Sequence, residues 1–409
     1  MNRSRVIASI LVVVIIAAAF FGSRLITRTP SSPKNAAFHT TPATPLSPAP
    51  TGGMSVEQRA LFDKYHLDNI KLPPGFRISV FAEVPTARSL SVSPKGVVYV
   101  GNRENGSVYA VVDHDHDGHA DGTYQVAQGL HVPNGVSFKD GDLYITTISS
   151  VYKVANVERD LSKPSTPELI YDKLPSDEMH GWKFTAFGPD GNLYIPVGIP
   201  CNNCVSGNEL YGTIARLNLS TKKLDIVAKG IRNTVGFDWK PDTGELWFTD
   251  NGRDQMGDDV PKDELNKVSK TGEDFGAPYC WEDAIQDTDV SPKKDCSLFT
   301  KPVVNLAPHA AALGMRFYTG SLFPAEYKNQ IFFAEHGSWN RATPIGYRIM
   351  LVRLDGDRAV SYEPFAEGWL GANGEVTGRP VDVATWTDGS LLVSDDKAGA
   401  IYRISYSTR

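Results

Sequence analysis

One pattern, repeated six times, limits what this chain can fold into. Each copy reads as a strand, a turn with Gly or Asp, and a second, aromatic-rich strand: SLSVSPKGVVYVG, GVSFKDGDLYITT, FTAFGPDGNLYIPVG, GFDWKPDTGELWFTD, MRFYTGSLFPAEYKNQIFFAE and VDVATWTDGSLLVSD. A further strand follows each copy: SVYAVV, VYKVAN, IARLNL, ELNKVS, IMLVRL and IYRIS. This succession is typical of propeller blades rather than of a sandwich. The sequence therefore predicts an all-β, six-bladed β-propeller, with FRISVFAEV (residues 76–84) as the outer strand that closes the ring.

Composition and charge agree with this fold and exclude some partners. The chain of 409 residues holds 36 Gly and 27 Pro, which suit many turns better than helix-rich packing. Its formal net charge of -6 gives no general reason to expect nucleic acid, and we expect no nucleic-acid partner.

The N-terminal residues have the pattern of a targeting segment. Arg3 and Arg5 precede an apolar run over residues 6–22, which is slightly short of the about 20 residues that a membrane-spanning helix needs. We favour an uncleaved anchor because the apolar run continues through Phe20 and Phe21. The alternative is a signal peptide that is removed. With either, the rest of the chain is exported, and we expect a periplasmic domain tethered to the inner membrane.

Three segments follow from these patterns. Residues 1–29 are the predicted signal anchor, and residues 30–71 are a Pro/Thr-rich linker that ends in a short helix. That helix is expected within residues 54–69, with Ser55 and Gln58 as a capping box. Residues 72–409 form the predicted propeller.

The four cysteines fit an oxidising compartment. Of three connectivities, the simplest pairs Cys201 with Cys204 and Cys280 with Cys296. The alternative for the Cys201–Cys204 pair is a redox or zinc role, but a disulfide that closes a loop is favoured.

Propeller geometry predicts where the site lies. The residues just before each inner strand must converge beside the central axis, and every blade places a polar residue there: Arg88, Asn134, His180, Arg232 with Asn233, His309 and Arg379. Loops leaving the second strands reach the same face: GNRENG, VGIPCNNC, TDNGRDQ, AEHGSWNR and SDDKAG. The alternative is that these are turn residues and solvated rim charges. Arginines without an acid in this ring favour a site for an organic anion, because guanidinium groups bind carboxylates with paired donors.

The chain from about Leu72 to Ser407 resembles the glucose/sorbosone dehydrogenase family, and most of all its bacterial sorbosone dehydrogenase branch. The similar stretches are LPPGFRISVFA, HGWKFTAFGPDGNLYIPVG, GIRNTVGFDWKPDTGELWFTDNGRD, LGMRFYTGSLFPAEY, EHGSWNR and GRPVDV. The resemblance implies a propeller that oxidises a sugar or sugar aldehyde with pyrroloquinoline quinone and Ca²⁺. It also implies a soluble or membrane electron acceptor.

Site residues carry over from the resemblance position by position. His180 matches the family's catalytic base, and Gly252 and Arg253 match the loop whose backbone carbonyls bind calcium. The resemblance assigns the cofactor to Asn134, Arg232, Asn233 and Arg379, and geometry adds Arg88, His309 and Arg341. The acid that orients the family's base has no counterpart here, because its place reads Val197-Gly198-Ile199-Pro200. Trp182, two residues after the predicted base, is expected to pack between blades.

The implied chemistry is hydride transfer from substrate to the quinone while a neutral His180 removes the hydroxyl proton. Nearby arginines are expected to keep the imidazole neutral. Two other functions remain open at this point: a calcium-dependent lactonase, whose site would need inward acids, and a binding module that has lost the cofactor.

A second calcium loop is a separate candidate. Oxygen ligands recur in Asp113-His-Asp115-His-Asp117-Gly-His-Ala-Asp121, although the twelfth position is Tyr124 instead of a bidentate acid. Hairpin turns rich in Asp and Gly have the same appearance, and the place between outer strands indicates a structural role.

Overall fold

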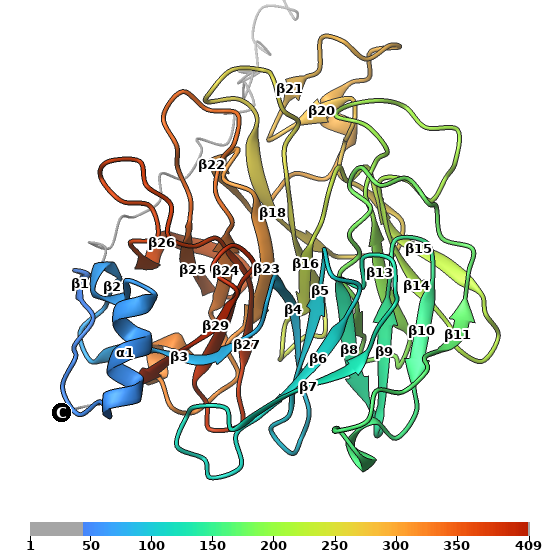
Figure 1. The fold of residues 1–409 in the computed structure, drawn as a ribbon. Coiled ribbons are helices and arrows are strands. Elements are labelled where there is room, and N and C mark those ends of the chain that lie inside the picture. The colour runs from blue at the N-terminus through green and yellow to red at the C-terminus, as the bar shows by residue number, and fades with distance from the viewer. Residues whose placement is uncertain (1–43, 408–409) are drawn as a thin grey trace, which may run out of the picture. The chain divides into compact units, whose positions relative to one another are not determined.

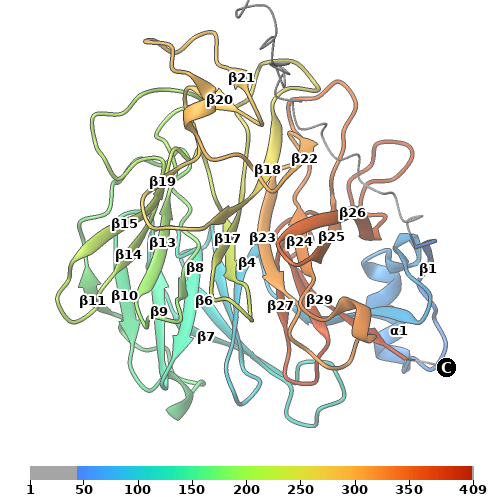
Figure 2. The same ribbon diagram turned by 180° about the vertical axis from the view of Figure 1, so that it is seen from behind.

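Six sheets surround a common axis and form the predicted β-propeller (Figures 1 and 2). The structure, a computed structural model, describes residues 44–407. The predicted anchor and the first part of the predicted linker lie outside this range. Within it, no helix is both long and apolar enough to cross a bilayer.

Each blade has four antiparallel strands, and the first of them lies nearest the axis. From the axis outward, blade 1 consists of β4 (Ala87–Val92), β5 (Val98–Asn102), β6 (Val108–Val112) and β7 (Gly122–Ala127), and blade 2 of β8 (Gly135–Lys139), β9 (Asp142–Thr146), β10 (Val151–Val154) and β11 (Glu168–Tyr171). Blade 3 consists of β12 (Ala186–Phe187), β13 (Leu193–Val197), β14 (Thr213–Leu217) and β15 (Leu224–Lys229), and blade 4 of β16 (Gly236–Trp239), β17 (Leu246–Asp250), β18 (Lys262–Val268) and β22 (Val304–Pro308). Blade 5 consists of β23 (Ala312–Phe317), β24 (Ile331–Glu335), β25 (Arg348–Asp355) and β26 (Arg358–Glu367), and blade 6 of β27 (Pro380–Thr385), β28 (Leu391–Asp395), β29 (Ala400–Tyr406) and β3 (Phe76–Glu83).

Blade 6 closes the ring with strands from both ends of the propeller. β3 pairs antiparallel with β29, from Phe76 opposite Tyr406 to Glu83 opposite Ala400. The predicted closing strand is thus confirmed. This pairing joins the two ends of the propeller within one blade and so closes the ring, while β3 remains the outer strand of that blade.

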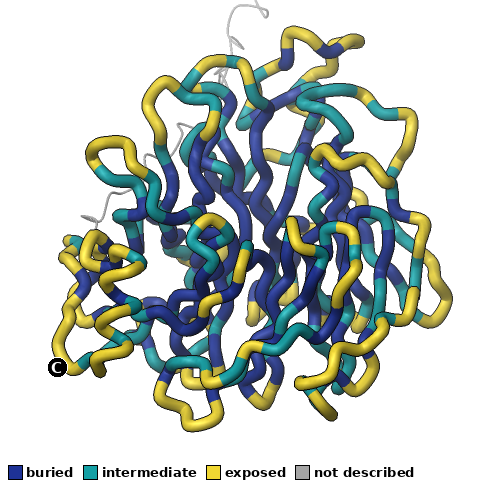
Figure 3. Tube along the Cα trace, in the orientation of Figure 1, coloured by how far each residue is buried: buried dark blue, intermediate teal, exposed yellow. Residues whose placement is uncertain are grey.

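Apolar side chains between neighbouring blades form the core. The second strands β5, β13, β17, β24 and β28 are buried at every residue, and Figure 3 shows the strands as mainly buried and the connecting loops as mainly exposed. A smaller cluster of Val235, Leu313 and Val381 lies on the inner strands of blades 4 to 6 or just before them. These packed interfaces fix each inner strand, and so the loop that precedes it.

The segment before the propeller packs on its outer edge. Helix α1 (Val56–Lys64) begins with the predicted capping box of Ser55 and Gln58, and it is followed by the short 3-10 helix η1 (Leu67–Asn69). Phe62 of α1 is buried in the core cluster that blades 5 and 6 share. Strands β1 (Ser47–Pro48) and β2 (Lys71–Leu72) add to the outer edge of β26.

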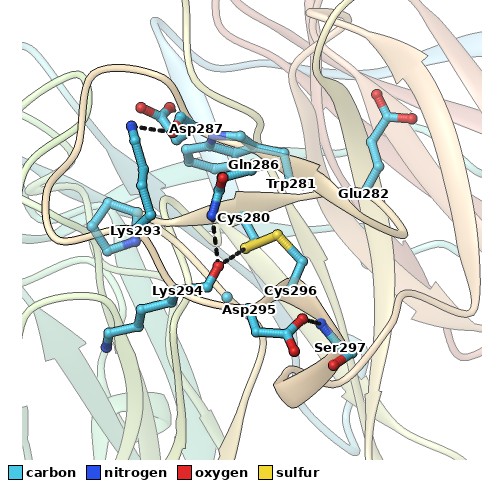
Figure 4. Close-up of a disulfide and its surroundings, with 12 residues drawn as sticks. Cys280, Trp281, Glu282, Gln286, Asp287, Lys293, Lys294, Asp295, Cys296 and Ser297 are labelled. Atoms are coloured by element: carbon cyan, nitrogen blue, oxygen red, sulfur yellow. Dashed lines mark hydrogen bonds between the residues drawn. A yellow bond between two sulfur atoms is a disulfide. The ribbon is translucent and has the colours of Figure 1, made fainter.

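One long insertion separates β18 from β22 and carries the second disulfide (Figure 4). It contains β19 (Glu273–Asp274), β20 (Cys280–Trp281), β21 (Ile285–Gln286) and η3 (Cys296–Leu298), and further 3-10 turns elsewhere are η2 (Val157–Arg159) and η4 (Ala325–Tyr327). Both disulfides have the predicted pairing, Cys201 with Cys204 and Cys280 with Cys296.

Candidate active site

A cavity of about 290 Å³ lies where the inner strands begin. Seven predicted site residues line it together: Arg88, His180, Arg232, Asn233, Gly252, His309 and Arg379. The geometric expectation that these groups meet at one place is confirmed, and their roles remain predictions.

Arg88, in β4, is the most deeply buried cation of the cavity. Its side chain is 1% exposed, with Nε donating to Asn134 Oδ1 at 2.7 Å and Nη1 donating to Asp396 Oδ2 at 2.7 Å. Nη2 is buried and has no hydrogen-bond partner among the described residues. A buried guanidinium nitrogen without an acceptor is costly unless a ligand supplies one. The Arg88 side chain is therefore built to meet an acceptor in the cavity.

Two further arginines lie near Arg88. Arg379 donates from Nε to His336 O at 3.1 Å and from Nη2 to Gly337 O at 2.9 Å. Arg103 stacks over the Trp182 ring, 3.9 Å from its centroid. Burial, and also the charges of Arg103 and Arg379, lower the pKa of Arg88, although Asp396 acts to raise it. The cations are close enough to repel one another, and an anion bound between them would relieve that repulsion.

Acids from the loops after the second strands complete the site, which the sequence analysis did not expect. Asp396 accepts from Arg88 and from His336 Nε2, the latter at 2.9 Å. Asp254 accepts from Arg232 Nη2 at 3.0 Å. Asp263 also lines the cavity, so its four arginines stand against three acids, and four minus three leaves one positive charge when all are ionised. The ring of residues before the inner strands does lack acids, but the cavity as a whole does not.

His180 is held as a neutral base. Its Nδ1 lies 2.8 Å from the carbonyl oxygen of Ile199, which can only accept, so Nδ1 carries the proton and Nε2 keeps its lone pair. Burial, and then the charge of Arg232, lower the pKa of His180 to about 3. Burial is the larger cause, whereas the sequence argument named only arginines. The Ile199 carbonyl occupies the orienting role for which the sequence shows no acid.

Arg232 is the most firmly anchored cation. Nε donates to Asn202 O at 2.8 Å, Nη1 to Asn251 O at 3.3 Å, and Nη2 to Asn202 Oδ1 at 2.9 Å as well as to Asp254. Its backbone N–H donates to Asp250 Oδ2 at 2.9 Å. Four of its five side-chain N–H groups are thus used, which leaves one for a ligand.

His309 presents a hydrogen-bond acceptor to the cavity, whereas the arginines present donors. Its Nε2 lies 2.9 Å from Gly257 O and 3.0 Å from Val260 O, so Nε2 carries the proton. Nδ1 is buried and accepts no hydrogen bond from the described residues. The imidazole therefore offers an acceptor to a hydroxyl or N–H group of a ligand.

Several non-glycine residues before the inner strands have left-handed backbones: Thr86, Val132, His180, His309 and Ala311, with φ between 50° and 59°. Such conformations cost free energy, most of all for a β-branched residue, and they persist where the surrounding structure enforces them. Of these residues, His180, His309 and Ala311 line the cavity, and strained backbone of this kind is typical of a functional site.

Three predicted residues do not line the cavity. Asn134 is fully buried and instead holds Arg88 and donates to Lys183 O at 3.0 Å. Arg341 pairs with the exposed Asp259 at 3.4 Å. The Arg253 side chain pairs with Asp287 at 2.8 Å, away from the cavity. Asn134 is thus placed as a support of Arg88, and Arg341 bonds to Thr343 and Asp259 instead of lining the cavity.

The sequence analysis missed Arg103, Asn251, Asp254 and Trp339, which lie in the loops it had assigned to this face, and Asp263, which lies in β18. His336, at the same rim, also lines the cavity. The expectation that Trp182 packs between blades is wrong, because its ring lines the cavity and lies beneath the Arg103 guanidinium. Burial lowers the pKa of His336 to about 4 despite Asp396.

Metal candidates separate into two places. In the part of the chain that the structure describes, the carbonyl oxygens of Gly252 and Arg253 accept no hydrogen bond, which suits a cation that takes oxygen ligands. In the β6–β7 loop the carboxylates of Asp113, Asp115 and Asp117 lie within 4.8 Å of one another. Asp121 instead accepts from the His114 backbone at 2.6 Å.

Comparisons with known proteins find a matching family and solved structures of similar fold. A family model described as glucose/sorbosone dehydrogenase matches residues 144–403. A Borreliella burgdorferi protein with no functional name is 33% identical over 354 residues, which cover 82% of this chain and 91% of that protein. The calcium structure of a Trichoderma reesei enzyme of carbohydrate-active family AA12 has a TM-score of 0.72, with 18% identity over 82% of this chain and 96% of that chain. The holo form of the PQQ domain of Coprinopsis cinerea pyranose dehydrogenase has a TM-score of 0.69, with 18% identity over 82% and 97%.

Proposed function

The chain belongs to the glucose/sorbosone dehydrogenase family, and from that membership we propose that it oxidises a sugar or sugar aldehyde, of the aldose or sorbosone type, with pyrroloquinoline quinone and Ca²⁺. The observation that carries the proposal is that a neutral histidine and an unpartnered buried arginine nitrogen face one cavity. The solved Coprinopsis domain is named for the same quinone.

The residues present fit this cofactor. Pyrroloquinoline quinone is a planar tricarboxylate, and four arginines stand against three acids at the cavity. Arg88 Nη2 would donate to a carboxylate oxygen, and His309 Nδ1 would accept from an N–H or O–H group. The free carbonyls of Gly252 and Arg253 would hold the calcium ion. When bound, the quinone supplies the hydride acceptor and the ion supplies Lewis acidity.

The protein's own part in the reaction is to position the base and to keep it in its neutral form. His180 Nε2 accepts the substrate hydroxyl proton, while the Ile199 carbonyl keeps the ring in the tautomer that makes this possible. Arg232 holds a fixed positive charge beside the base. That charge disfavours imidazolium and so keeps the base ready at neutral pH.

The side of the cavity that meets substrate is suggested by a second depression. It is lined by His180, Trp182, Arg103, Glu104, His131 and Met179, among others. His180 therefore lies in a wall between the arginine-rich cavity and a space open to solvent. A sugar would approach the base from this depression.

Place and partners extend the proposal. Two disulfides suit an oxidising compartment, and we propose a periplasmic enzyme whose N-terminal segment tethers it to the inner membrane. Electrons would pass to a soluble or membrane-bound acceptor.

The alternative of a calcium lactonase is disfavoured by how the acids are used. Asp254 is paired with Arg232, and Asp263 accepts the backbone N–H groups of Gly252 and Ala312. Among residues 44–407, the only group of three acids, cysteines or histidines close enough to hold an ion is Asp113, Asp115 and Asp117. The cavity thus lacks a ready carboxylate cage.

The test is reconstitution. Purified protein is incubated with pyrroloquinoline quinone and CaCl₂, and bleaching of a redox dye is followed with aldoses and sorbosone, with quinone omitted as the control. Quinone-dependent oxidation supports the proposal. Hydrolysis of sugar lactones without quinone would support the lactonase, and an absence of both reactions would support a binding module.

A further inference from the structure

One loop holds both the proposed base and the anchored arginine. It leaves β13 as residues 198–204 and ends in the disulfide-closed turn Cys201-Asn-Asn-Cys204. Near its start, the Ile199 carbonyl accepts from His180 Nδ1, and the Ile199 N–H donates to Arg232 O at 2.9 Å. This loop thus joins the segments that precede the inner strands of blades 3 and 4.

Asn202, inside the disulfide turn, makes the side-chain half of this connection. Its carbonyl oxygen accepts from Arg232 Nε at 2.8 Å, and its Oδ1 accepts from Arg232 Nη2 at 2.9 Å. The same Oδ1 accepts the Asp254 N–H at 2.9 Å, and Nδ2 donates to Asp254 O at 3.0 Å. Asn202 therefore holds both Arg232 and the acid paired with it.

The neighbouring Asn203 faces a different set of groups. Its Nδ2 donates to Asp287 Oδ2 at 2.8 Å and to Pro278 O at 3.3 Å, both in the insertion between β18 and β22. No hydrogen bond joins Asn203 to Arg232 among the described residues. Two adjacent asparagines of one turn thus serve separate partners, and this makes Asn203 a matched control.

We propose that Asn202 is a positioning residue for Arg232, and that the Cys201–Cys204 disulfide fixes the turn so that the guanidinium stays beside His180. Opening the disulfide frees Asn202, and the two acceptors that Asn202 offers to Arg232 are lost together, which leaves Asn251 and Asp254 as its side-chain partners. The site is therefore sensitive to thiols through this one turn. The inference rests on the proposed function only for its activity measurement.

The physical reason is that a charged group in a buried place needs fixed acceptors. Arg232 is 3% exposed, and Asn202 accepts two of its four side-chain hydrogen bonds. A turn of four residues closed by a disulfide has few conformations to lose, so it presents the asparagine with little entropic cost. The other groups that bear on His180 are Lys183 and the Ile199 carbonyl.

The first measurement is an NMR titration of the His180 imidazole in protein without cofactor, between about pH 3 and pH 8. In wild type we expect only the start of a titration, at the acid end of this range. Asn202→Ala removes one acceptor and should raise the pKa of His180 by part of its shift, because Arg232 moves away while burial, the larger cause, remains. Cys201→Ser/Cys204→Ser should raise it further. Asn203→Ala should leave it as in wild type.

The second measurement is turnover of the loaded enzyme. We expect kcat to fall about tenfold in Asn202→Ala and about a hundredfold in the double serine variant, since small misplacement of a reacting group has effects of this size. Cys280→Ser/Cys296→Ser, which opens the other disulfide, should keep kcat.

The two measurements distinguish the possible failures. If His180 titrates alike in wild type, Asn202→Ala and the double serine variant, the positioning role is refuted. An equal shift in Asn203→Ala would refute it too, because general loosening of the turn would then be the cause. If wild type oxidises no sugar, the proposed function fails, but the titration still decides the inference.

Discussion

Replacing His180 by Ala tests the base directly. The ring donates from Nδ1 to Ile199 O at 2.8 Å, and burial followed by the Arg232 charge lowers its pKa to about 3. At pH 7 nearly every molecule thus holds the neutral form with Nε2 free. Alanine removes this acceptor and leaves the arginines of the cavity in place.

The expected loss follows from the role of the base. General-base catalysis contributes about 10²- to 10⁴-fold, which corresponds to about 3–5 kcal/mol of transition-state stabilisation. A base with a pKa of about 3 is weak, and the Brønsted relation then places the effect near the lower end, about a hundredfold in kcat. Affinity for the quinone should change by less than about threefold, since the arginines that bind its carboxylates are untouched.

The pH dependence follows from the same pKa. Because the folded pKa is about 3, protonation of His180 should not reduce kcat between about pH 8 and pH 5. The unfolded histidine titrates near pH 6.5, so the unfolded state binds the extra proton first. Its contribution to stability is therefore full above about pH 6.5 and is lost as the pH falls toward 3.

The assay is single-turnover and steady-state oxidation by the reconstituted enzyme, with circular dichroism to verify folding. His66→Asn is the control, because His66 is exposed and lines neither the cavity nor the depression beside it. If His180→Ala binds the quinone normally and turns over within about threefold of wild type, the assignment of the base is wrong.

Three other perturbations test how the fold supports the site. Gly101→Ala would place its Cβ 2.0 Å from the Asn134 carbonyl oxygen. Urea unfolding should show that the free energy of unfolding falls by about 3 kcal/mol. Quinone binding should weaken as well, because Asn134 moves. Burial raises the pKa of Asp395 to about 7, so the folded state keeps a proton between about pH 4 and pH 7 that the unfolded chain releases. Wild-type stability relative to Asp395→Asn should therefore fall as pH rises through this window, and parallel curves would contradict the argument. Cys280→Ser/Cys296→Ser opens a loop with a sequence separation of 16, and calorimetry should show a loss of about 3 kcal/mol.

The repeat carries most of the information about the fold. Strand, turn and strand patterns are local, so their number and order can be read directly, and each predicted third strand is present: β6, β10, β14, β18, β25 and β29. The closing strand β3 also follows from the pattern, because a ring of blades needs one strand from the other end of the chain.

The part of the site that depends on the blade repeat was predictable from the sequence. Residues just before inner strands reach the axis in every blade, which is why Arg88, His180, Arg232 and Arg379 could be placed together. The period does not say which way a side chain turns at the end of a loop. Arg341 and Trp339 lie two residues apart, yet Trp339 lines the cavity and Arg341 pairs with Asp259 outside it.

The sequence by itself determined the blade count and the face on which the loops gather, and it favoured the disulfide partners that the structure has. Only the tertiary structure decided the pairing of charges. Asp396 meets Arg88 across 308 residues of chain, and Asn202 reaches Arg232 from the loop of another blade. Such contacts depend on how closed blades bring distant loops together, and they set the free donors, the net charge of the cavity and the protonation state of His180. Those properties arise from burial and distance in space, and no local pattern in the chain encodes either one.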